Sequence, residues 1–272
     1  MSGDTPTVQA AGQAGGQQVA SSRVAGTQAI QRAFTVLTLF RDEGAPLGVV
    51  QIAERLGFTL STAHRIARAL VAEGYLTQDE GRERYRLGAQ ALLLGQAAQR
   101  ALGVDAVRPV LEGLARETGE SVNLGLLDGD QVVVIYRVES TQPLRFSMAV
   151  GSRIELYASS MGKSLLAFND GLADYAERRA DSFAPLTPTT HVDAAGLRAD
   201  IEQIRQRGWS TDDEESLLAV RCVGAPVVDL FGQARAAVAV QAPAVRMPDG
   251  RFDELGPLVR RAADEVGRLL PL

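Results

Sequence analysis

The order of elements expected between residues 27 and 88 constrains the fold of this 272-residue chain more than any other feature. Apolar residues at helical spacing predict three short amphipathic helices. These helices span residues 28–41, 49–56 and 59–70. A polar turn then lies between two β-like stretches, residues 75–77 and 84–87. Three helices followed by a hairpin are typical of a winged helix-turn-helix, a motif that docks on double-stranded DNA.

The third predicted helix has an apolar face and a polar face. The apolar stripe consists of Ala63, Ile66, Ala67 and Leu70, and Thr59 can cap the helix. The polar face carries Ser61, Thr62, Arg65 and Arg68. An arginine fork fits guanine O6 and N7 or a phosphate, and hydroxyls near a helix start suit phosphate oxygens. An ordinary solvated helix would show the same residues, but the hairpin that follows favours DNA readout.

The predicted hairpin supplies further arginines. Arg82, Arg84 and Arg86 alternate, so in a strand they share one face and can reach the DNA backbone or minor groove. Glu80 and Glu83 beside them indicate modest affinity there. Packing or capping fits His64 better than base reading, although it lies on the same helix. The candidate DNA-binding residues are Ser61, Thr62, His64, Arg65, Arg68, Arg82 and Arg84.

The rest of the chain divides into three further segments. Residues 1–26 contain almost no large apolar side chains and predict a disordered tail. Residues 89–103 predict a connecting helix, and residues 104–272 predict helices that flank a largely antiparallel sheet. The expected fold class is therefore α+β with two domains, the first spanning residues 27–88.

Elements of the second domain follow from periodicity and turn signals. The expected helices span residues 105–118, 162–169, 194–207 and 252–270. The expected strands span residues 122–127, 131–139, 144–149, 153–157, 221–228 and 234–241. Asp128-Gly129 and Gly232 are the turn signals for two hairpins.

Charge and composition limit the class of protein. Residues 27–101 carry nine arginines against seven carboxylates, whereas residues 102–272 carry 18 basic and 25 acidic groups. A basic first half beside an acidic second half suits a DNA-contacting module joined to another domain. No run of 18 apolar residues and no secretory signal are present, and a single cysteine suits a reducing cytoplasm.

Gly162-Lys163-Ser164 matches the end of a phosphate-binding loop, but Tyr157 occupies the position of the first required glycine. Nucleotide binding is therefore not expected. The N-terminus of the predicted helix at Ser160 suits an anion or carboxylate. Simple helix capping by Ser160 is an equally good interpretation.

Other polar residues of the second domain do not form a catalytic set. The acidic run 212–215 could suggest a cation site, but a solvated loop with one member turned inward is the better interpretation. Cys222 lies in an apolar strand and is expected in the core. Nothing marks His191 as the base for Ser160 or Ser164, so neither catalysis nor a metal site is expected.

Eight segments together resemble the IclR family of bacterial transcriptional regulators over residues 27–270. They span residues 61–65, 73–75, 85–88, 128–130, 137–140, 158–167, 208–215 and 220–227. The resemblance implies a winged helix-turn-helix, a linker helix and a GAF-like domain at residues 104–272 for effector binding and oligomerisation. It also implies a homodimer or homotetramer, palindromic operator DNA, a small-molecule effector and no cofactor. The recognition helix would be Leu60–Ala72, with Leu60 in place of a frequent lysine.

The resemblance also implies an effector pocket. Its residues would be Phe146, Ile154, Ser160, Met161, Asp212, Val220, Cys222, Ala239 and Gln241. Members that bind very small keto acids carry a Ser-x-Ser pair where this chain has Ala239 and Gln241, and a Gly-Ala pair at Ser160-Met161. Loss of a hydroxyl and gain of bulk predict a larger effector, an aromatic carboxylate or amide held at the Ser160 helix end.

These features predict an effector-responsive regulator of a catabolic operon, a repressor rather than an activator. Two rival interpretations remain. The chain could be a metabolite-binding enzyme with a vestigial DNA-binding domain, which the lack of a catalytic constellation disfavours. It could also be a ligand-independent DNA binder, which would leave the second domain without a role.

Overall fold

The computed structural model describes residues 27–272 except residues 80 and 82. The expectations for the tail at 1–26 and for Arg82 therefore lie outside the described residues. The chain divides between Ala101 and Leu102 into two compact units.

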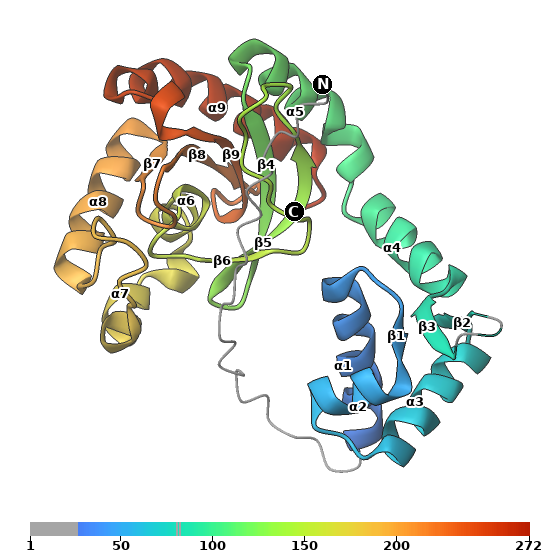
Figure 1. Ribbon diagram of the computed structural model, residues 1–272. Coiled ribbons are helices and arrows are strands. Elements are labelled where there is room, and N and C mark those ends of the chain that lie inside the picture. The colour runs from blue at the N-terminus through green and yellow to red at the C-terminus, as the bar shows by residue number, and fades with distance from the viewer. Residues whose placement is uncertain (1–26, 80, 82) are drawn as a thin grey trace, which may run out of the picture. The chain divides into compact units, whose positions relative to one another are not determined.

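The first unit contains four helices and a three-stranded antiparallel sheet of order β1-β3-β2 among the described residues (Figure 1). The helices are α1 (Gln28–Glu43), α2 (Val49–Leu56), α3 (Leu60–Ala72) and α4 (Ala89–Ala101). The strands are β1 (Leu47–Gly48), β2 (Leu76–Gln78) and β3 (Arg84–Leu87). Strand β1, which the sequence did not indicate, pairs with β3 and closes the sheet against the helices.

Capping and burial explain where α3 begins and how it packs. The Thr59 hydroxyl accepts a hydrogen bond from the Thr62 amide at 3.2 Å, and so satisfies a free donor of the first turn. The predicted apolar stripe is buried in a small core with α1, α2 and the sheet. In α1, helical spacing predicts one buried face made of Ile30, Ala33, Phe34, Leu37 and Phe40. This prediction is wrong in part, because Ile30 and Phe34 are exposed whereas Val36, outside that face, is buried. Helix α1 has more apolar residues than one face can bury, and packing selects the side of Val36 and Phe40.

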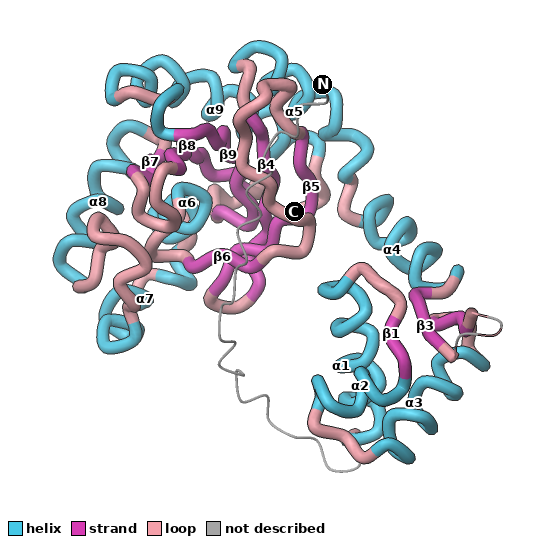
Figure 2. The backbone as a smooth tube through the Cα atoms, in the orientation of Figure 1, coloured by secondary structure: helices cyan, strands magenta, loops and turns pink. Residues whose placement is uncertain are grey.

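The second unit is built on a six-stranded antiparallel sheet of order β6-β5-β4-β9-β8-β7 (Figures 1 and 2). Its strands are β4 (Ser121–Asp128), β5 (Gln131–Val138), β6 (Arg153–Glu155), β7 (Ser210–Asp213), β8 (Val220–Val228) and β9 (Ala234–Pro243). Its helices are α5 (Val104–Thr118), α6 (Ser160–Ala167), α7 (Tyr175–Arg179), α8 (Ala194–Arg207) and α9 (Asp249–Leu269), with short 3-10 turns at 170–172, 180–182 and 244–246.

Two apolar cores form, one on each face of this sheet. Helices α5 and α9 cover one face, and α6 with α7 and α8 covers the other. Helix α6 lies very close to the strands because glycines remove side chains at the contact. A Cβ on Gly224 would lie 2.9 Å from the Ser160 carbonyl, and a Cβ on Gly162 would lie 2.3 Å from the Leu156 carbonyl.

Three expectations for the second unit are wrong. Residues 144–149 form no strand but an irregular segment, because no neighbouring strand offers them a ladder of hydrogen bonds. Ser160 does not cap α6: the helix begins at Ser160, and Ser159 caps it by accepting a hydrogen bond from the Gly162 amide at 3.1 Å. The acidic run at 212–215 is not a solvated loop: Asp212 lies in β7, and both Asp212 and Glu215 are buried.

Candidate DNA-binding and effector sites

Helix α3 presents a polar surface to solvent. Ser61, His64, Arg65 and Arg68 are exposed and Thr62 is half-buried, on the side opposite the buried stripe. Because His64 is exposed, it does not serve the packing role that its sequence context favoured. Leu60 at the helix start is also exposed, and a large apolar group there adds no phosphate contact.

The hairpin of β2 and β3 carries the other arginines. Arg84 and Arg86 are exposed on β3, whereas Tyr85 between them is buried in the core. The Nε atom of Arg86 lies 3.1 Å from Asp79 Oδ1, so this arginine has a local ion-pair partner. Arg84 has no carboxylate within 4 Å among the described residues and remains available to a phosphate.

A row of polar side chains crosses the face of the large sheet that α6 covers. Directly opposed residues of neighbouring strands share a face. Asp212 on β7 opposes Cys222 on β8, Cys222 opposes Gln241 on β9, and Gln241 opposes Ser121 on β4. The row lies beneath the first turn of α6, where the Ser210 hydroxyl donates to the Ser160 carbonyl at 2.6 Å.

The predicted effector residues lie in this region of the second unit. Ser160, Met161, Asp212, Val220, Cys222, Ala239 and Gln241 are buried, whereas Phe146 and Ile154 are half-buried. Met161 and Ala239 belong to one apolar cluster, and Ile154 packs against it. The Ser160 side chain contacts Cys222, and burial raises the pKa of that thiol well above its ordinary value. Cys222 therefore contributes a neutral, unreactive side chain to this region.

Two of these residues have structural partners that sequence reasoning did not anticipate. Ser160 is the first residue of α6 rather than its cap. Asp212 accepts hydrogen bonds from the Glu215 amide at 2.8 Å and from the Ser216 hydroxyl, so it fixes the turn after β7. Burial raises the pKa of Asp212 to about 6 despite these bonds.

Arg137 on β5 is the most polar member of the site and was absent from the predicted set. Its Nη1 donates to Asn123 Oδ1 and to Gln241 Oε1, both at 2.9 Å. Its Nη2 donates to Ser121 Oγ at 3.3 Å and to the Phe146 carbonyl. Burial lowers the pKa of the guanidinium. A charged donor thus joins β4, β5, β9 and the segment after β5.

A second polar cluster holds α6 against α8. Lys163, the only lysine in the chain, is fully buried, and its Nζ lies 2.6 Å from both Asp200 Oδ2 and Glu215 Oε1. Burial would raise the pKa of Asp200, but hydrogen bonds and charges of His191 and Lys163 lower it to about 2. Lys163 thus takes part in an internal ion network and not in phosphate binding.

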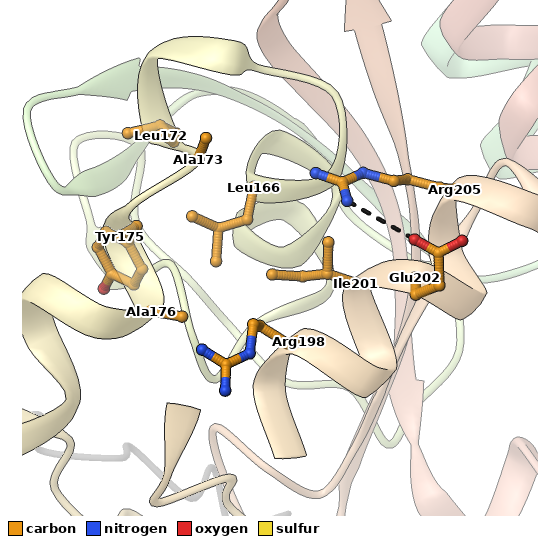
Figure 3. A pocket seen from close by; sticks show the side chains of 9 residues that line it. All are labelled: Leu166, Leu172, Ala173, Tyr175, Ala176, Arg198, Ile201, Glu202 and Arg205. Atoms are coloured by element: carbon orange, nitrogen blue, oxygen red, sulfur yellow. Dashed lines mark ion pairs between the residues drawn. The ribbon is translucent and has the colours of Figure 1, made fainter. Parts of the chain in front are cut away.

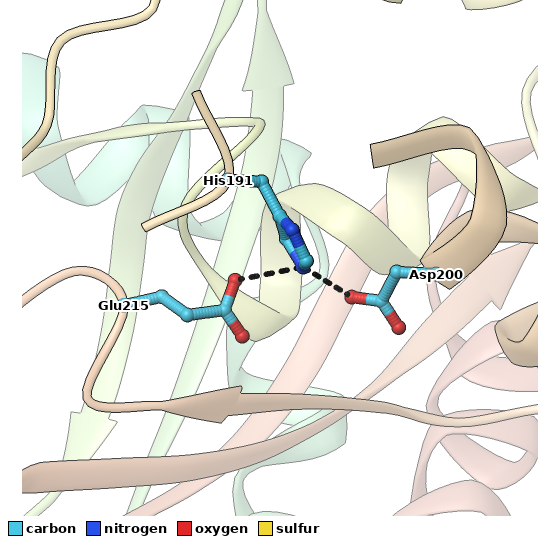
Figure 4. Close-up of side chains that lie close together, drawn as sticks. All are labelled: His191, Asp200 and Glu215. Carbon is cyan, nitrogen blue, oxygen red and sulfur yellow. Dashed lines mark ion pairs between the residues drawn. The ribbon is translucent and has the colours of Figure 1, made fainter. Parts of the chain in front are cut away.

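His191, Asp200 and Glu215 converge from three segments (Figure 4). The His191 Nε2 atom lies 3.5 Å from Asp200 Oδ2 and 3.8 Å from Glu215 Oε2. These are ligand types that bind transition metals. The Lys163 ammonium already lies within hydrogen-bond distance of both carboxylates, and a metal ion there would have to displace it. The cluster is therefore best described as an ion network.

A cavity of about 310 Å³ opens between α6, α7 and α8 (Figure 3). Leu166, Tyr175 and Ile201 line it, and the charges at its edge are paired, Arg205 with Glu202 at 3.7 Å. None of the predicted effector residues lines this cavity. Because the charged groups at its edge are already paired, this cavity has fewer free donors for an anion than the polar row has.

Among the described residues, no helix has the length and apolar character needed to cross a membrane. The chain matches a family model described as IclR helix-turn-helix domain at residues 29–80, and one described as bacterial transcriptional regulator IclR C-terminal at residues 96–268.

Two relatives and one solved structure illustrate the similarity. The HTH-type transcriptional regulator BhcR of Paracoccus denitrificans is 36% identical over 94% of this chain and 91% of its own. The acetate operon repressor of Salmonella typhimurium is 30% identical over 88% of each chain. An IclR homologue of Microbacterium hydrocarbonoxydans, crystallised with 4-hydroxybenzoate, superposes with a TM-score of 0.74 at 20% identity over 89% of this chain and 97% of its own.

These matches confirm the expected fold class, a helix-turn-helix unit followed by an antiparallel sheet with helices. They also confirm that the chain is a DNA-binding regulator of transcription and not an enzyme, which removes the rival enzymatic interpretation. The chain belongs to the IclR family of bacterial transcriptional regulators.

Proposed function

We propose that the protein is an effector-responsive repressor of a catabolic operon. It binds a palindromic operator through α3 and the β2–β3 hairpin, and a small aromatic carboxylate or amide in the second unit changes its DNA affinity. The observation that carries the DNA-binding part is the polar face of α3, where Arg65 and Arg68 are exposed opposite a fully apolar buried stripe.

The effector part is supported by the buried polar row beneath α6. The apolar cluster that contains Met161 and Ala239 lies beside this row. Met161 narrows the space near Gly125, where a Cβ would lie 3.1 Å from the Met161 Sδ atom. Gln241 offers an amide where a smaller side chain would leave room for a keto acid. A relative of the same fold, the Microbacterium homologue, was crystallised with an aromatic acid.

A second copy of the chain is the partner that α4 fits. None of its thirteen residues is buried, and Leu92, Leu93 and Leu94 are 53–64% exposed. A helix with this many exposed leucines calls for an apolar partner. Two such helices in a dimer would pair two copies of α3 with the two halves of a palindrome, and a tetramer would add a second pair.

Selection from random duplex DNA, followed by anisotropy titrations of the full chain, tests the DNA-binding part. Arg65→Ala should weaken binding to the selected site by about 1–3 kcal/mol, whereas Arg84→Ala should weaken all duplexes alike and reduce the salt slope. Arg41→Ala, on α1, is the matched control. An unchanged affinity in Arg65→Ala would refute the assignment of α3.

Thermal unfolding with small keto acids, hydroxybenzoates and their amides tests the effector part. A ligand at about 100 times its dissociation constant adds roughly 2.7 kcal/mol to the stability of the unit that binds it. A shift with aromatic compounds that also changes DNA affinity supports the proposal. A response to glyoxylate or pyruvate alone would refute the aromatic class.

A further inference from the structure

The partly buried cations of the second unit differ in how their charge is balanced. Arg246 holds both oxygens of Glu120 at 2.6 Å, and Arg221 lies within 2.8 Å of both Asp213 and Asp249. Lys163 has two carboxylate partners, as described above. Arg137 has no carboxylate within 4 Å among the described residues and bonds only to neutral oxygens. Among the partly buried arginines and the lysine of the second unit, as far as the structure describes them, Arg137 is the one without a carboxylate partner.

The hydrogen bonds of Arg137 are made by its two terminal nitrogens, Nη1 and Nη2. Nη1 is held by two side-chain oxygens, those of Asn123 and Gln241. Nε is buried and has no hydrogen-bond partner among the residues that the structure describes. Nη2 has one long bond to Ser121 and one bond to a backbone carbonyl. Nε and Nη2 form one edge of the planar group, and such an edge can hold both oxygens of a carboxylate.

The carbonyl on that edge comes from a segment that can give way. Phe146 lies in the irregular stretch between β5 and β6, where residues 141–145 are exposed and no strand forms. Asn123 and Gln241, in contrast, lie in the paired strands β4 and β9. The bonds from the paired strands therefore orient the guanidinium, whereas the carbonyl that Nη2 binds belongs to a segment without strand pairing.

A buried charge without a counter-ion is costly, and neutral acceptors compensate it only in part. An acidic ligand would supply the missing charge. Cys222 can contact the body of such a ligand, since it lies beside Ser160 at the start of α6 and opposes Gln241 in register. The site thus fits a monocarboxylate attached to an apolar group.

We propose that Arg137 binds the carboxylate of the effector through its Nε–Nη2 edge, with Asn123 and Gln241 as positioning residues. The carboxylate displaces the Phe146 carbonyl from Nη2. This inference rests on the proposed effector-responsive function and deepens it, because it selects the acid over the amide. It also places the acidic group at β5 rather than at the N-terminus of α6.

Calorimetric titration of the full chain with 4-hydroxybenzoate and 4-hydroxybenzamide tests the assignment. A charge-assisted pair of hydrogen bonds corresponds to roughly a 10- to 100-fold loss of affinity when it is removed. Arg137→Gln should show this loss for the acid and little change for the amide. Arg137→Lys should recover part of the acid affinity, since it keeps the charge but not the fork. Arg235→Gln, an exposed arginine of the same sheet, should behave as wild type.

Gln241→Glu keeps the inference testable if Arg137 variants do not fold. The new carboxylate would lie at the Nη1 atom, 2.9 Å away in the present geometry, and would balance the buried charge from within. We expect this variant to unfold at a higher temperature than wild type and to bind the acid more weakly. Unchanged acid affinity in a folded variant would count against Arg137.

The binding results distinguish a failure of the Arg137 assignment from a failure of the proposed effector-responsive function. Equal binding of the acid by wild type and Arg137→Gln overturns the role of Arg137 and leaves the effector class intact. Ligand concentrations of about 10 mM detect binding free energies down to roughly 3 kcal/mol. If wild type binds none of acetate, glyoxylate, benzoate or 4-hydroxybenzoate at this concentration, the carboxylate site is overturned. Release of DNA by a neutral compound would then still support the proposed regulation, whereas no response to any compound would refute both.

Discussion

Replacement of Lys163 by methionine would test whether the ion network between α6 and α8 stabilises the second unit. Methionine retains most of the apolar volume of lysine but removes the ammonium that lies 2.6 Å from both Asp200 and Glu215. The two carboxylates would then face each other with 14% and 7% of their side chains exposed. His191, 3.5 Å from Asp200, would be the nearest remaining cation when protonated.

The expected loss follows from the burial of the charges that remain. Removal of one partner of a buried ion pair costs about 3–5 kcal/mol, because the other partner stays desolvated without compensation. For a domain of this size, each kcal/mol lowers the midpoint of thermal unfolding by about 2–4 °C. We therefore expect Lys163→Met to lower the midpoint of the second unit by roughly 6–20 °C at pH 8.

The stabilities of wild type and of Lys163→Met should depend on pH in opposite directions. In wild type, the lowered pKa of Asp200, about 2, contributes stability that is complete above the ordinary value of 3.8 and is lost as the pH falls toward 2. Without the lysine, the carboxylates take up protons more readily in the folded state than in the unfolded state. The variant therefore gains stability as the pH falls, and the difference between the two proteins shrinks from pH 8 to pH 5.

Trp209 makes the measurement specific to the second unit. It is the only tryptophan in the chain, so its fluorescence in urea follows this unit and not the DNA-binding unit. The control variant combines Lys163→Met with Asp200→Asn and Glu215→Gln, which removes all three charges and should restore most of the stability. A loss below about 1 kcal/mol at pH 8, or an equal loss at pH 5, would refute the reasoning.

Three further predictions follow from burial and exposure. Gly162→Ala should destabilise the second unit by about 1–3 kcal/mol, because its Cβ would meet the Leu156 carbonyl at 2.3 Å, whereas Gly95→Ala in α4 has open space and should not; thermal unfolding distinguishes them. Burial raises the pKa of Asp212 to about 6, so wild type should lose about 2 kcal/mol of stability relative to Asp212→Asn as the pH rises from 4 to 6. Urea titrations measure this loss, and an equal pH dependence of the two proteins contradicts it. Leu92→Glu should weaken self-association in sedimentation velocity, and an unchanged sedimentation coefficient would exclude α4 from the interface.

The fold of the DNA-binding unit could be predicted in detail because its determinants are local. Thr59 caps α3 within three residues, and the stripe from Ala63 to Leu70 repeats within two turns. The error on α1 has a different origin. Its sequence offers two apolar faces, and only the tertiary contacts of Phe40 with its neighbours decide which face is buried.

In the second unit, hairpins were predicted well but the irregular parts were not. Asp128-Gly129 and Gly232 are strong turn signals, and the strands on either side of them pair as expected. Residues 144–149 have a strand-like sequence, yet strand formation also requires a neighbour with free hydrogen-bonding groups. Strand β6 pairs with β5 at residues 131–133, and residues 144–149 pair with no strand and remain irregular.

The chemistry of the candidate effector site could not be predicted, because its polar contacts join residues far apart in the sequence. Arg137 meets Asn123 and Gln241, which are 14 and 104 residues away, only through the register of β5, β4 and β9. The sequence pointed to the helix start at Ser160 because a helix N-terminus is a local signal for an anion. Local signals identify groups that can bind a charge, whereas the sheet register determines which charge remains unbalanced. In this fold the second criterion favours Arg137, because its neighbour Gln241 is a neutral side chain that leaves the charge of the guanidinium without a counter-ion.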